Sequence, residues 1–237
     1  MHKTNRMTFA LAVKCADGAI LATDTRFTVN GGSDHVYGHK ITGEISGVLT
    51  AFAGSREPFE EFRMRLREFT AEPEEKRRRL DQLWIRIKEI MRSLNQQYSQ
   101  HEFDVLVATN LVVPQTILRY FYQDGRSEQI EKYKAIGAGA PYGQIYLKTL
   151  YREDLTMHQA AGLAYFIVRY IERFKLELTV GTGGEFPHPL IRFIPPLHLS
   201  EIYEVEPTKN QNELYETNAQ IRLNKVEKSL VSNYYEL

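Results

Sequence analysis

Four residues near the start of the sequence have the types and spacing that a nucleophilic hydrolase needs. Thr8 is followed by Asp24, Lys40 and Gly54 at offsets of 16, 32 and 46 residues. A threonine that begins a chain carries its own base, because its free α-amine has a pKa of about 7.7–8.0 and can accept the hydroxyl proton. A lysine ammonium would favour the alkoxide, an aspartate would hold that lysine, and a glycine N–H could bind the oxyanion. The set predicts threonine-type hydrolysis with no metal or organic cofactor.

The surrounding segments carry a family resemblance. "TFALAVKCADGAILATDTRFT", with "HKI" and "AFAGS" behind it, resembles the beginning of a proteasome β-type subunit, one of the N-terminal nucleophile (Ntn) hydrolases. The match runs without a gap from Thr8 to Gly54. The resemblance implies that Thr8 is the nucleophile, that Asp24 and Lys40 activate it and that the Gly54 N–H forms the oxyanion hole.

Three further positions gain a role from this resemblance. We interpret Arg26 as a supporting partner of Asp24 rather than a reactant. Thr28 would offer a backbone site to an extended substrate, or it is an ordinary strand threonine. Phe52 would line the specificity pocket, with a simple core position as an equal alternative.

The later part of the sequence departs from the pattern of active subunits. Ala138 stands where many active subunits have a serine beside the α-amine. Such subunits also have an aspartate followed three residues later by a serine. "LELTVGTGG" offers Glu177 with Val180, or Thr179 with Thr182, and neither pair reproduces both residues. The segments "PYGQIYLKTL" and "TVG" resemble the bacterial ancestral β-subunit (Anbu-like) branch.

The residue before Thr8 decides whether the α-amine is available. It is Met7, where active β subunits normally have a glycine that precedes the cleavage point. Residues 1–7 are therefore expected to be an N-terminal extension or to precede the true start of translation. In the second case, translation begins at Met7, and an aminopeptidase removes this methionine because threonine is small.

The first hairpin must place these side chains. With a three-residue loop over 16–18, paired residues would sum to 34, so Ala10 would oppose Asp24 and Thr8 would oppose Arg26. Thr8, Asp24 and Arg26 would then share one face of the hairpin. A two-residue loop would instead put Thr8 and Asp24 on opposite faces.

Hydrophobic periodicity predicts strands, two helices, strands, two helices and strands again. Blocks of this kind favour an α+β fold, here a four-layer αββα sandwich of two antiparallel sheets flanked by helix pairs, formed by residues 8–237 as one domain. The helix over 156–174 is apolar on almost every side and should be buried on two faces. The expected strands are 8–14, 18–24, 35–41, 46–54, 102–110, 116–123, 133–139, 176–182, 189–196 and 200–207. The expected helices are 57–70, 74–98, one behind Pro141, 156–174 and 208–233.

Composition excludes several other classes of protein. The 237 residues contain 30 basic and 30 acidic side chains, so no net charge favours nucleic acid or an anionic membrane. We see no membrane-spanning run, no secretory signal and only one cysteine, which predicts a cytoplasmic protein. The pair His35 and His39 is spaced poorly for a metal, and "GTGGEF" lacks the lysine of a phosphate-binding loop.

The sequence therefore predicts a threonine-type hydrolase, most simply a self-compartmentalising peptidase that acts on peptides or proteins. The resemblance implies a homo-oligomeric ring or spiral, and an unfoldase partner stays unknown. One alternative is a noncatalytic assembly subunit. Another is an amidase, or an acyl or peptide transferase, that uses the same nucleophile.

Overall fold

The computed structural model describes residues 8–29, 34–69, 79–111, 116–176, 180–185, 187–196 and 207–235. The strands are β1 (Phe9–Cys15), β2 (Gly18–Thr23), β3 (Arg26–Val29), β4 (Asp34–Tyr37), β5 (Ile41–Ile45), β6 (Val48–Gly54), β7 (Phe103–Thr109), β8 (Ile117–Phe121), β9 (Ser127–Gln129), β10 (Tyr133–Gly137) and β11 (Leu190–Ile194). The helices are α1 (Arg56–Glu68), α3 (Leu80–Gln97), α4 (Ala140–Leu150), α5 (Met157–Arg173) and α6 (Lys209–Tyr235).

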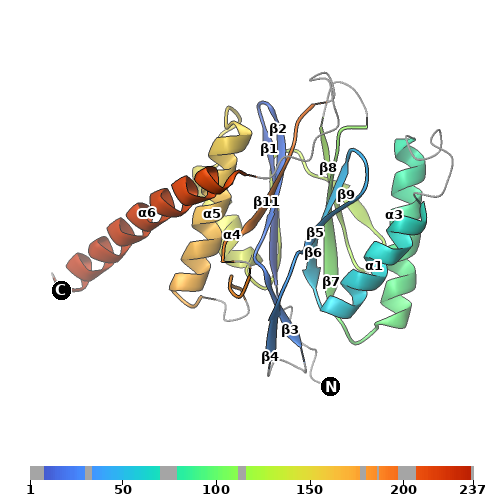
Figure 1. Ribbon diagram of the computed structural model, residues 1–237, viewed down its shortest axis with the longest axis horizontal. Coiled ribbons are helices and arrows are strands. Elements are labelled where there is room, and N and C mark those ends of the chain that lie inside the picture. The colour runs from blue at the N-terminus through green and yellow to red at the C-terminus, as the bar shows by residue number, and fades with distance from the viewer. Residues whose placement is uncertain are drawn as a thin grey trace.

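Two antiparallel sheets face each other at the centre of the molecule. One has the strand order β10-β1-β2-β11 and the other β5-β6-β7-β8-β9, while β3 and β4 form a small separate ribbon. Helices α4 and α5 cover the outer side of the first sheet, and α1 and α3 cover the outer side of the second (Figure 1). The α+β class with antiparallel sheets is confirmed.

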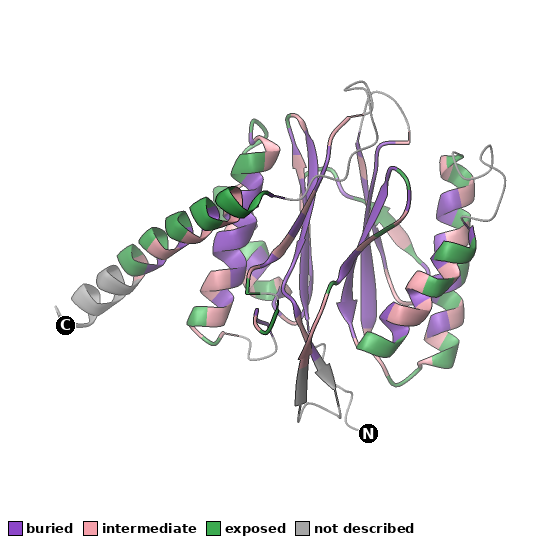
Figure 2. Ribbon diagram, in the orientation of Figure 1, coloured by how far each residue is buried: buried purple, intermediate pink, exposed green. Residues whose placement is uncertain are grey.

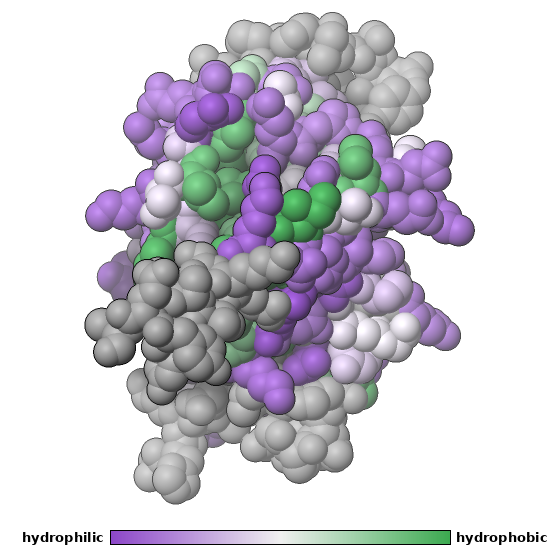
Figure 3. All heavy atoms as spheres, turned by 90° about the vertical axis from the view of Figure 1, so that its left-hand side faces the viewer, coloured by the Kyte–Doolittle hydropathy of each residue, from purple (hydrophilic) through white to green (hydrophobic). Residues whose placement is uncertain are grey.

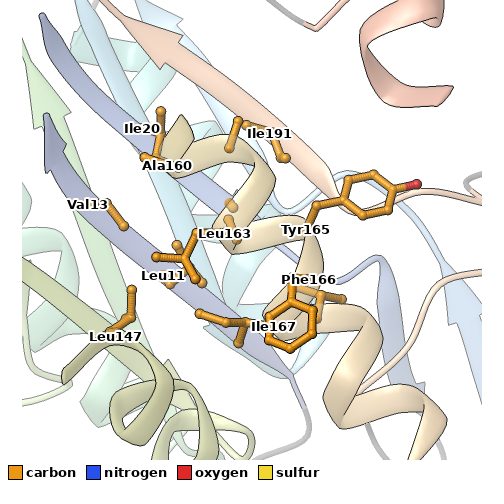
Figure 4. Close-up of a cluster of buried hydrophobic side chains, with 14 of the residues drawn as sticks. Leu11, Val13, Ile20, Leu147, Ala160, Leu163, Tyr165, Phe166, Ile167 and Ile191 are labelled. Carbon is orange, nitrogen blue, oxygen red and sulfur yellow. The ribbon is translucent and has the colours of Figure 1, made fainter. Parts of the chain in front are cut away.

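Three apolar clusters fill the spaces between these elements. The first packs β1 and β2 against α4, α5 and α6, and Figure 4 shows Leu11 and Ile20 of the sheet beside Ile167 and Ala160 of α5. The second lies between β6, β7 and the helices α1 and α3. The third, rich in alanine, lies where the two sheets meet. Small side chains there let the sheets approach closely, and the buried strands show as continuous purple in Figure 2.

Helix α5 has the burial that its sequence predicts. Thr156 and Gln159 form a complete capping box at its start, an arrangement that stabilises a helix end by about 1 kcal/mol. One face of α5 packs on the first sheet and another contacts Tyr215, Ala219 and Leu223 of α6. This helix is therefore buried on two faces, as expected.

The register of the first hairpin differs from the prediction. Cys15 pairs with Gly18 and Ala10 pairs with Thr23, so paired residues sum to 33 and the loop is Ala16-Asp17 alone. Leu21 consequently joins Ala10 between the sheets, whereas Ala22 faces the helices. The predicted three-residue loop, and the shared strand face that it implied for Thr8, Asp24 and Arg26, were wrong.

The boundaries of two other strands differ from the prediction. The predicted strand 35–41 is broken at residues 38–40, so β4 pairs with β3 and only β5 pairs with β6. The predicted strand over 46–54 begins two residues later, at Val48, because Ser46-Gly47 form the turn between β5 and β6, where Gly47 has a positive φ of 76°. The predicted strand over 200–207 lies outside the described residues, apart from Pro207.

Helix α6 closes the chain and extends away from the body of the molecule (Figure 1). Its N-terminal part packs on α5, where Tyr215 and Ala219 are buried. Among the described helices, none combines the length and apolarity that crossing a membrane requires.

Candidate active site

Thr8 lies directly before β1, at the end of the first sheet, and its side chain is fully buried. Its hydroxyl oxygen accepts a hydrogen bond of 2.6 Å from the Gly54 backbone N–H. Gly54 ends β6 of the opposite sheet. The facing ends of the two sheets thus bring the candidate nucleophile to the candidate oxyanion donor, although 46 residues separate them.

Asp24 reaches this place because the chain leaves the β-ladder at Thr23. Its N–H still donates to the Phe9 carbonyl, at 3.2 Å, but the Phe9 N–H donates to the Asp24 carboxylate Oδ1, at 2.9 Å. The carboxylate has replaced the backbone carbonyl that a continued strand would offer. The strict alternation of faces therefore ends at Thr23, which is why Asp24 turns inward despite the two-residue loop.

Lys40 is fully buried and forms an ion pair of 2.6 Å with Asp24 Oδ1. Its ammonium also donates to the Arg26 backbone carbonyl, and it lies 4.9 Å from the ring centre of Phe27. Asp24 Oδ1 and the Arg26 carbonyl accept two of the three N–H donors of the ammonium.

Burial sets the protonation behaviour of this pair. It lowers the pKa of Lys40 to about 8, with Asp24 acting in the opposite direction. Burial raises the pKa of Asp24, and Lys40 and the N–H groups of Phe9 and Gly181 counter that effect. A lysine with a pKa near 8 can change protonation state close to neutral pH, which is the behaviour of catalytic lysines.

Gly54 cannot be replaced without moving the candidate oxyanion donor. Its φ is +147°, and a Cβ atom there would lie 2.6 Å from the Glu102 carbonyl oxygen. Only glycine accepts that conformation together with so close a neighbour. The backbone N–H therefore has a fixed position relative to the Thr8 hydroxyl.

A second glycine fixes the main chain of Thr8. The Thr8 carbonyl accepts a hydrogen bond of 2.8 Å from the Ala138 N–H. Gly137 has a φ of +85°, and a Cβ atom there would overlap the Thr8 carbonyl oxygen. Ala138 thus contributes its backbone to the site, although its side chain offers no hydroxyl. The sequence shows that the hydroxyl is missing at position 138, but it does not show that the Ala138 N–H is hydrogen-bonded to Thr8.

The segment around Gly181 completes the surroundings of Asp24. The Gly181 N–H donates to Asp24 Oδ2 at 3.2 Å, and its carbonyl accepts from the N–H groups of Thr25 and Arg26, each at 3.1 Å. The sequence pattern does not predict this contact, because it is made by the backbone of a glycine that lies between polar side chains.

Two of the four candidates for the accessory positions lie in the described part of the chain, and two do not. Glu177 and Thr179 lie outside the described residues. Val180 is buried in the apolar cluster beneath α5. The Thr182 hydroxyl accepts a hydrogen bond of 2.6 Å from Arg169. Of the two candidates that the structure describes, Thr182 is the one with a polar partner.

Arg26 and Thr28 lie along the path that leads away from Asp24. The Arg26 guanidinium packs on Gly181 and lies 5.9 Å from the ring centre of Tyr37. Thr28 is paired through its backbone with His35, in the β3–β4 ribbon. Its contact with a substrate stays a prediction.

Phe52 occupies a core position. It is 1 % exposed, and its ring centre lies 5.2 Å from that of Phe59 and 5.8 Å from that of Phe103. These contacts belong to the apolar cluster beneath α1 and α3. Its role in a specificity pocket stays a prediction.

The parts of the chain that the structure describes hold no group of three or more His, Cys, Asp or Glu residues arranged for a metal ion. The single cysteine, Cys15, is buried, and burial raises the pKa of its thiol to about 12. A thiol of that kind is a poor nucleophile, so Thr8 and the groups around it are the reactive centre to consider.

Comparison with known proteins identifies the family of this chain. The proteasome subunit family matches residues 5–176, and the chain belongs to this family. A comparison with curated proteins gave no match.

Solved structures of the ancestral β-subunit share the fold. A mutant of Anbu from Hyphomicrobium sp. strain MC1 superposes with a TM-score of 0.75 at 14 % identity, over 94 % of this chain and 96 % of that chain. Anbu from Yersinia bercovieri, described as an ancestral beta-subunit, gives a TM-score of 0.74 at 16 % identity, over 97 % and 98 % of the two chains. At these identities the likeness is one of fold.

Proposed function

We propose that this protein is a threonine-type Ntn hydrolase that cleaves peptide bonds with Thr8. The observation that carries the proposal is the 2.6 Å hydrogen bond between the Gly54 N–H and the Thr8 hydroxyl oxygen. In the proposed enzyme this hydrogen bond joins the oxyanion donor to the nucleophile, next to the buried Lys40–Asp24 pair. Membership of the proteasome subunit family and the two facing sheets, which we propose form the αββα sandwich of Ntn hydrolases, support it.

The mechanism requires a mature chain that begins at Thr8. While Met7 is attached, the Thr8 nitrogen belongs to an amide and cannot act as a base. We propose that residues 1–7 are absent from the mature protein, which leaves residues 8–237 as one domain. Removal of a starting Met7 by an aminopeptidase is the simplest route.

In the proposed reaction the free α-amine takes the proton of the Thr8 hydroxyl, and the oxygen attacks the substrate carbonyl carbon. The Gly54 N–H binds the oxyanion, and Lys40, oriented by Asp24, favours the negative charge that develops. The C–N bond then breaks as the α-ammonium returns its proton to the leaving amine. Water, activated by the same amine, hydrolyses the Thr8 ester and regenerates the enzyme.

Arg26, Thr28 and Phe52 keep subsidiary roles in the proposal. Arg26 supports the segment that carries Asp24, consistent with its packing on Gly181. Thr28 would pair with an extended peptide through its backbone. Phe52, given its core contacts, would influence substrate choice only from beneath the site.

Assembly of several copies is part of the proposal. Ile145 and Leu150 on α4 and Leu214 and Ile221 on α6 are large apolar side chains with 41–61 % of their surface exposed. Figure 3 shows apolar atoms gathered on the side of the molecule that carries these helices. Such a surface favours contact with another protein chain, and the proteasome family suggests further copies of this one. A cytoplasmic location stays a prediction from the sequence.

A noncatalytic assembly subunit is the second candidate. It is favoured by the complete burial of Thr8 in the chain that carries residues 1–7, and by the alanine at position 138.

Covalent labelling separates the two functions. One form of the protein starts at Met1, and a second is released from a cleavable fusion so that Thr8 is its first residue. Both are treated with a peptide epoxyketone, which needs the hydroxyl and the free amine of one threonine. The proposed enzyme gives an adduct on Thr8 in the second form only. No adduct on verified Thr8-first protein would reject the hydrolase and favour the assembly subunit.

A further inference from the structure

A polar cluster on the far side of the Gly181 segment is not used by the mechanism above. Arg169, on α5, donates to Glu216 of α6 through Nε at 2.9 Å and Nη2 at 2.7 Å. Tyr165 also donates to Glu216, at 2.6 Å, and its hydroxyl lies 2.5 Å from His188 Nδ1. Figure 4 shows the Tyr165 hydroxyl pointing away from the apolar cluster. The Glu216 carboxylate therefore links α6 to two side chains of α5, in addition to the apolar packing between these helices.

The same arginine reaches the segment next to the candidate active site. Arg169 Nη1 donates to the Thr182 hydroxyl at 2.6 Å and to Glu172 Oε2 at 2.8 Å. Glu172 Oε1 accepts the Thr182 backbone N–H at 2.9 Å. Thr182 is thus held at both its side chain and its main chain by neighbouring residues of α5.

The residue before Thr182 in the chain, Gly181, is the one that contacts Asp24. The Gly181 N–H donates to Asp24 Oδ2, and the Gly181 carbonyl accepts the N–H groups of Thr25 and Arg26. Any displacement of Thr182 must move Gly181, because the two share a peptide bond. A path of hydrogen bonds and one peptide bond therefore runs from Glu216 on α6, through Arg169, Thr182 and Gly181, to Asp24, the partner of Lys40.

We propose that Arg169 is a positioning residue for the active site, which holds the Gly181 N–H on Asp24 and makes that contact depend on the docking of α6. The catalytic consequence rests on the proposed function. The positional part, that Arg169 fixes the 180–182 segment, stands on the hydrogen bonds alone. Arg169 keeps its charge in this setting: burial acts against it, but hydrogen bonds to Glu172 and Glu216 raise its pKa.

The electrostatic effect of losing this contact has a definite sign. The Gly181 N–H directs its positive end at the Asp24 carboxylate, beside the Lys40 ammonium and with Arg26 as the other nearby cation. Without that N–H the potential at Lys40 becomes more negative, which raises the pKa of Lys40. The protonated lysine would then persist to higher pH.

The test compares two arginines of α5 that both contact α6. Arg169→Met removes the contact with Thr182, whereas Arg173→Met removes a hydrogen bond to Gln220 of α6 and serves as the control. Thr182→Val and Thr182→Ser form a second pair, because serine keeps the hydroxyl that Arg169 binds. All variants begin at Thr8.

Two readouts are measured. The first is amide hydrogen exchange of the peptide that contains Gly181 and Thr182. The second is the rate of epoxyketone labelling as a function of pH. Arg169→Met and Thr182→Val should speed the exchange about tenfold, slow labelling about tenfold and move the alkaline limb of the pH profile upward. Arg173→Met and Thr182→Ser should stay close to the parent protein.

The outcomes separate the two proposals. If the parent protein is not labelled, the proposed function fails, while the exchange data still decide the positional part. Exchange that is unchanged in Arg169→Met, or equally faster in Arg173→Met, overturns the inference. Labelling that slows without any movement of the alkaline limb also overturns it, because general destabilisation would do the same.

Discussion

The half of the site around Thr8, Asp24 and Lys40 is made of side chains, whereas the half at Gly137, Ala138 and Gly181 is made of backbone. The side chains supply the nucleophile and the charges. The backbone groups supply hydrogen bonds that orient them: the Ala138 N–H on the Thr8 carbonyl and the Gly181 N–H on the Asp24 carboxylate. The side chains therefore carry out the proposed chemistry, whereas the backbone groups at Gly137, Ala138 and Gly181 position those side chains. The two sets of groups can be perturbed separately.

Removal of the buried lysine should have the largest effect. Lys40→Met leaves the Asp24 carboxylate buried without its 2.6 Å partner, which costs about 3–5 kcal/mol of unfolding free energy. Labelling of Thr8 should fall by about a thousandfold or more. Urea unfolding and epoxyketone kinetics measure the two effects.

The control for that variant is Lys132→Met. Lys132 pairs with Glu153 at 2.7 Å, but both side chains are more than half exposed, so its loss should cost at most about 1 kcal/mol. Labelling at the parental rate in folded Lys40→Met would show that the Lys40–Asp24 pair does not take part in catalysis.

The next largest effect on labelling is expected when one methyl group is added beside the Thr8 main chain. Gly137→Ala forces a Cβ atom into the Thr8 carbonyl oxygen and should slow labelling about a hundredfold. Gly125→Ala is the matched control, since Gly125 also has a positive φ, of 81°, but the atoms nearest to its Cβ atom would be those of the Arg92 side chain and the Lys88 carbonyl oxygen.

Gly125→Ala should lose about 1 kcal/mol of stability from backbone strain. Gly137→Ala should lose more, because its Cβ atom would also collide with the Thr8 carbonyl oxygen. Labelling of Gly137→Ala at the parental rate, in protein shown to be folded, would contradict the role that we give to this backbone half.

The pH dependence of labelling should change more modestly. Because burial lowers the pKa of Lys40 to about 8, the ammonium loses its proton as the pH rises through this value. The labelling rate of Thr8-first protein should therefore decline above a pH of about 8. Lys40→Arg would keep its charge there, since an arginine pKa lies above about 12.

In Lys40→Arg the alkaline decline should therefore disappear, although the rate at its maximum will be lower because the guanidinium has a different shape. A decline of the same form in both proteins would assign this titration to another group.

The smallest effect is expected from the side chain of Ala138. Its backbone N–H provides the contact with Thr8, so Ala138→Ser should change the unfolding free energy by no more than about 0.5 kcal/mol. A hydroxyl beside the α-amine should raise labelling, by less than about tenfold. A larger rise would mean that the absence of a hydroxyl at position 138 affects the labelling rate more than the Ala138 backbone hydrogen bond does.

This division also explains what the sequence could predict. Thr8, Asp24, Lys40 and Gly54 were recognised because their residue types carry chemistry, and the structure brings them together. The helix over 156–174 was expected because its apolar side chains are visible in the sequence, and α5 spans Met157–Arg173.

Register and backbone contacts were harder to predict. The first hairpin differs from its prediction by one residue, since Ala16-Asp17-Gly18 is compatible with either loop length. Asp24 reaches Lys40 because it binds the Phe9 N–H in place of a strand carbonyl, and strand alternation does not describe that contact. Gly181 and Arg169 become adjacent to the site only through folding.

The central claim is that the mature protein begins at Thr8 and uses it as the nucleophile. The most direct measurement is the intact mass and N-terminal sequence of the protein isolated from its own cells, before and after treatment with an epoxyketone. We predict a chain that starts at Thr8 and gains one inhibitor mass on that residue. A chain that retains Met7, or one that starts at Thr8 but gains no mass, would contradict the claim.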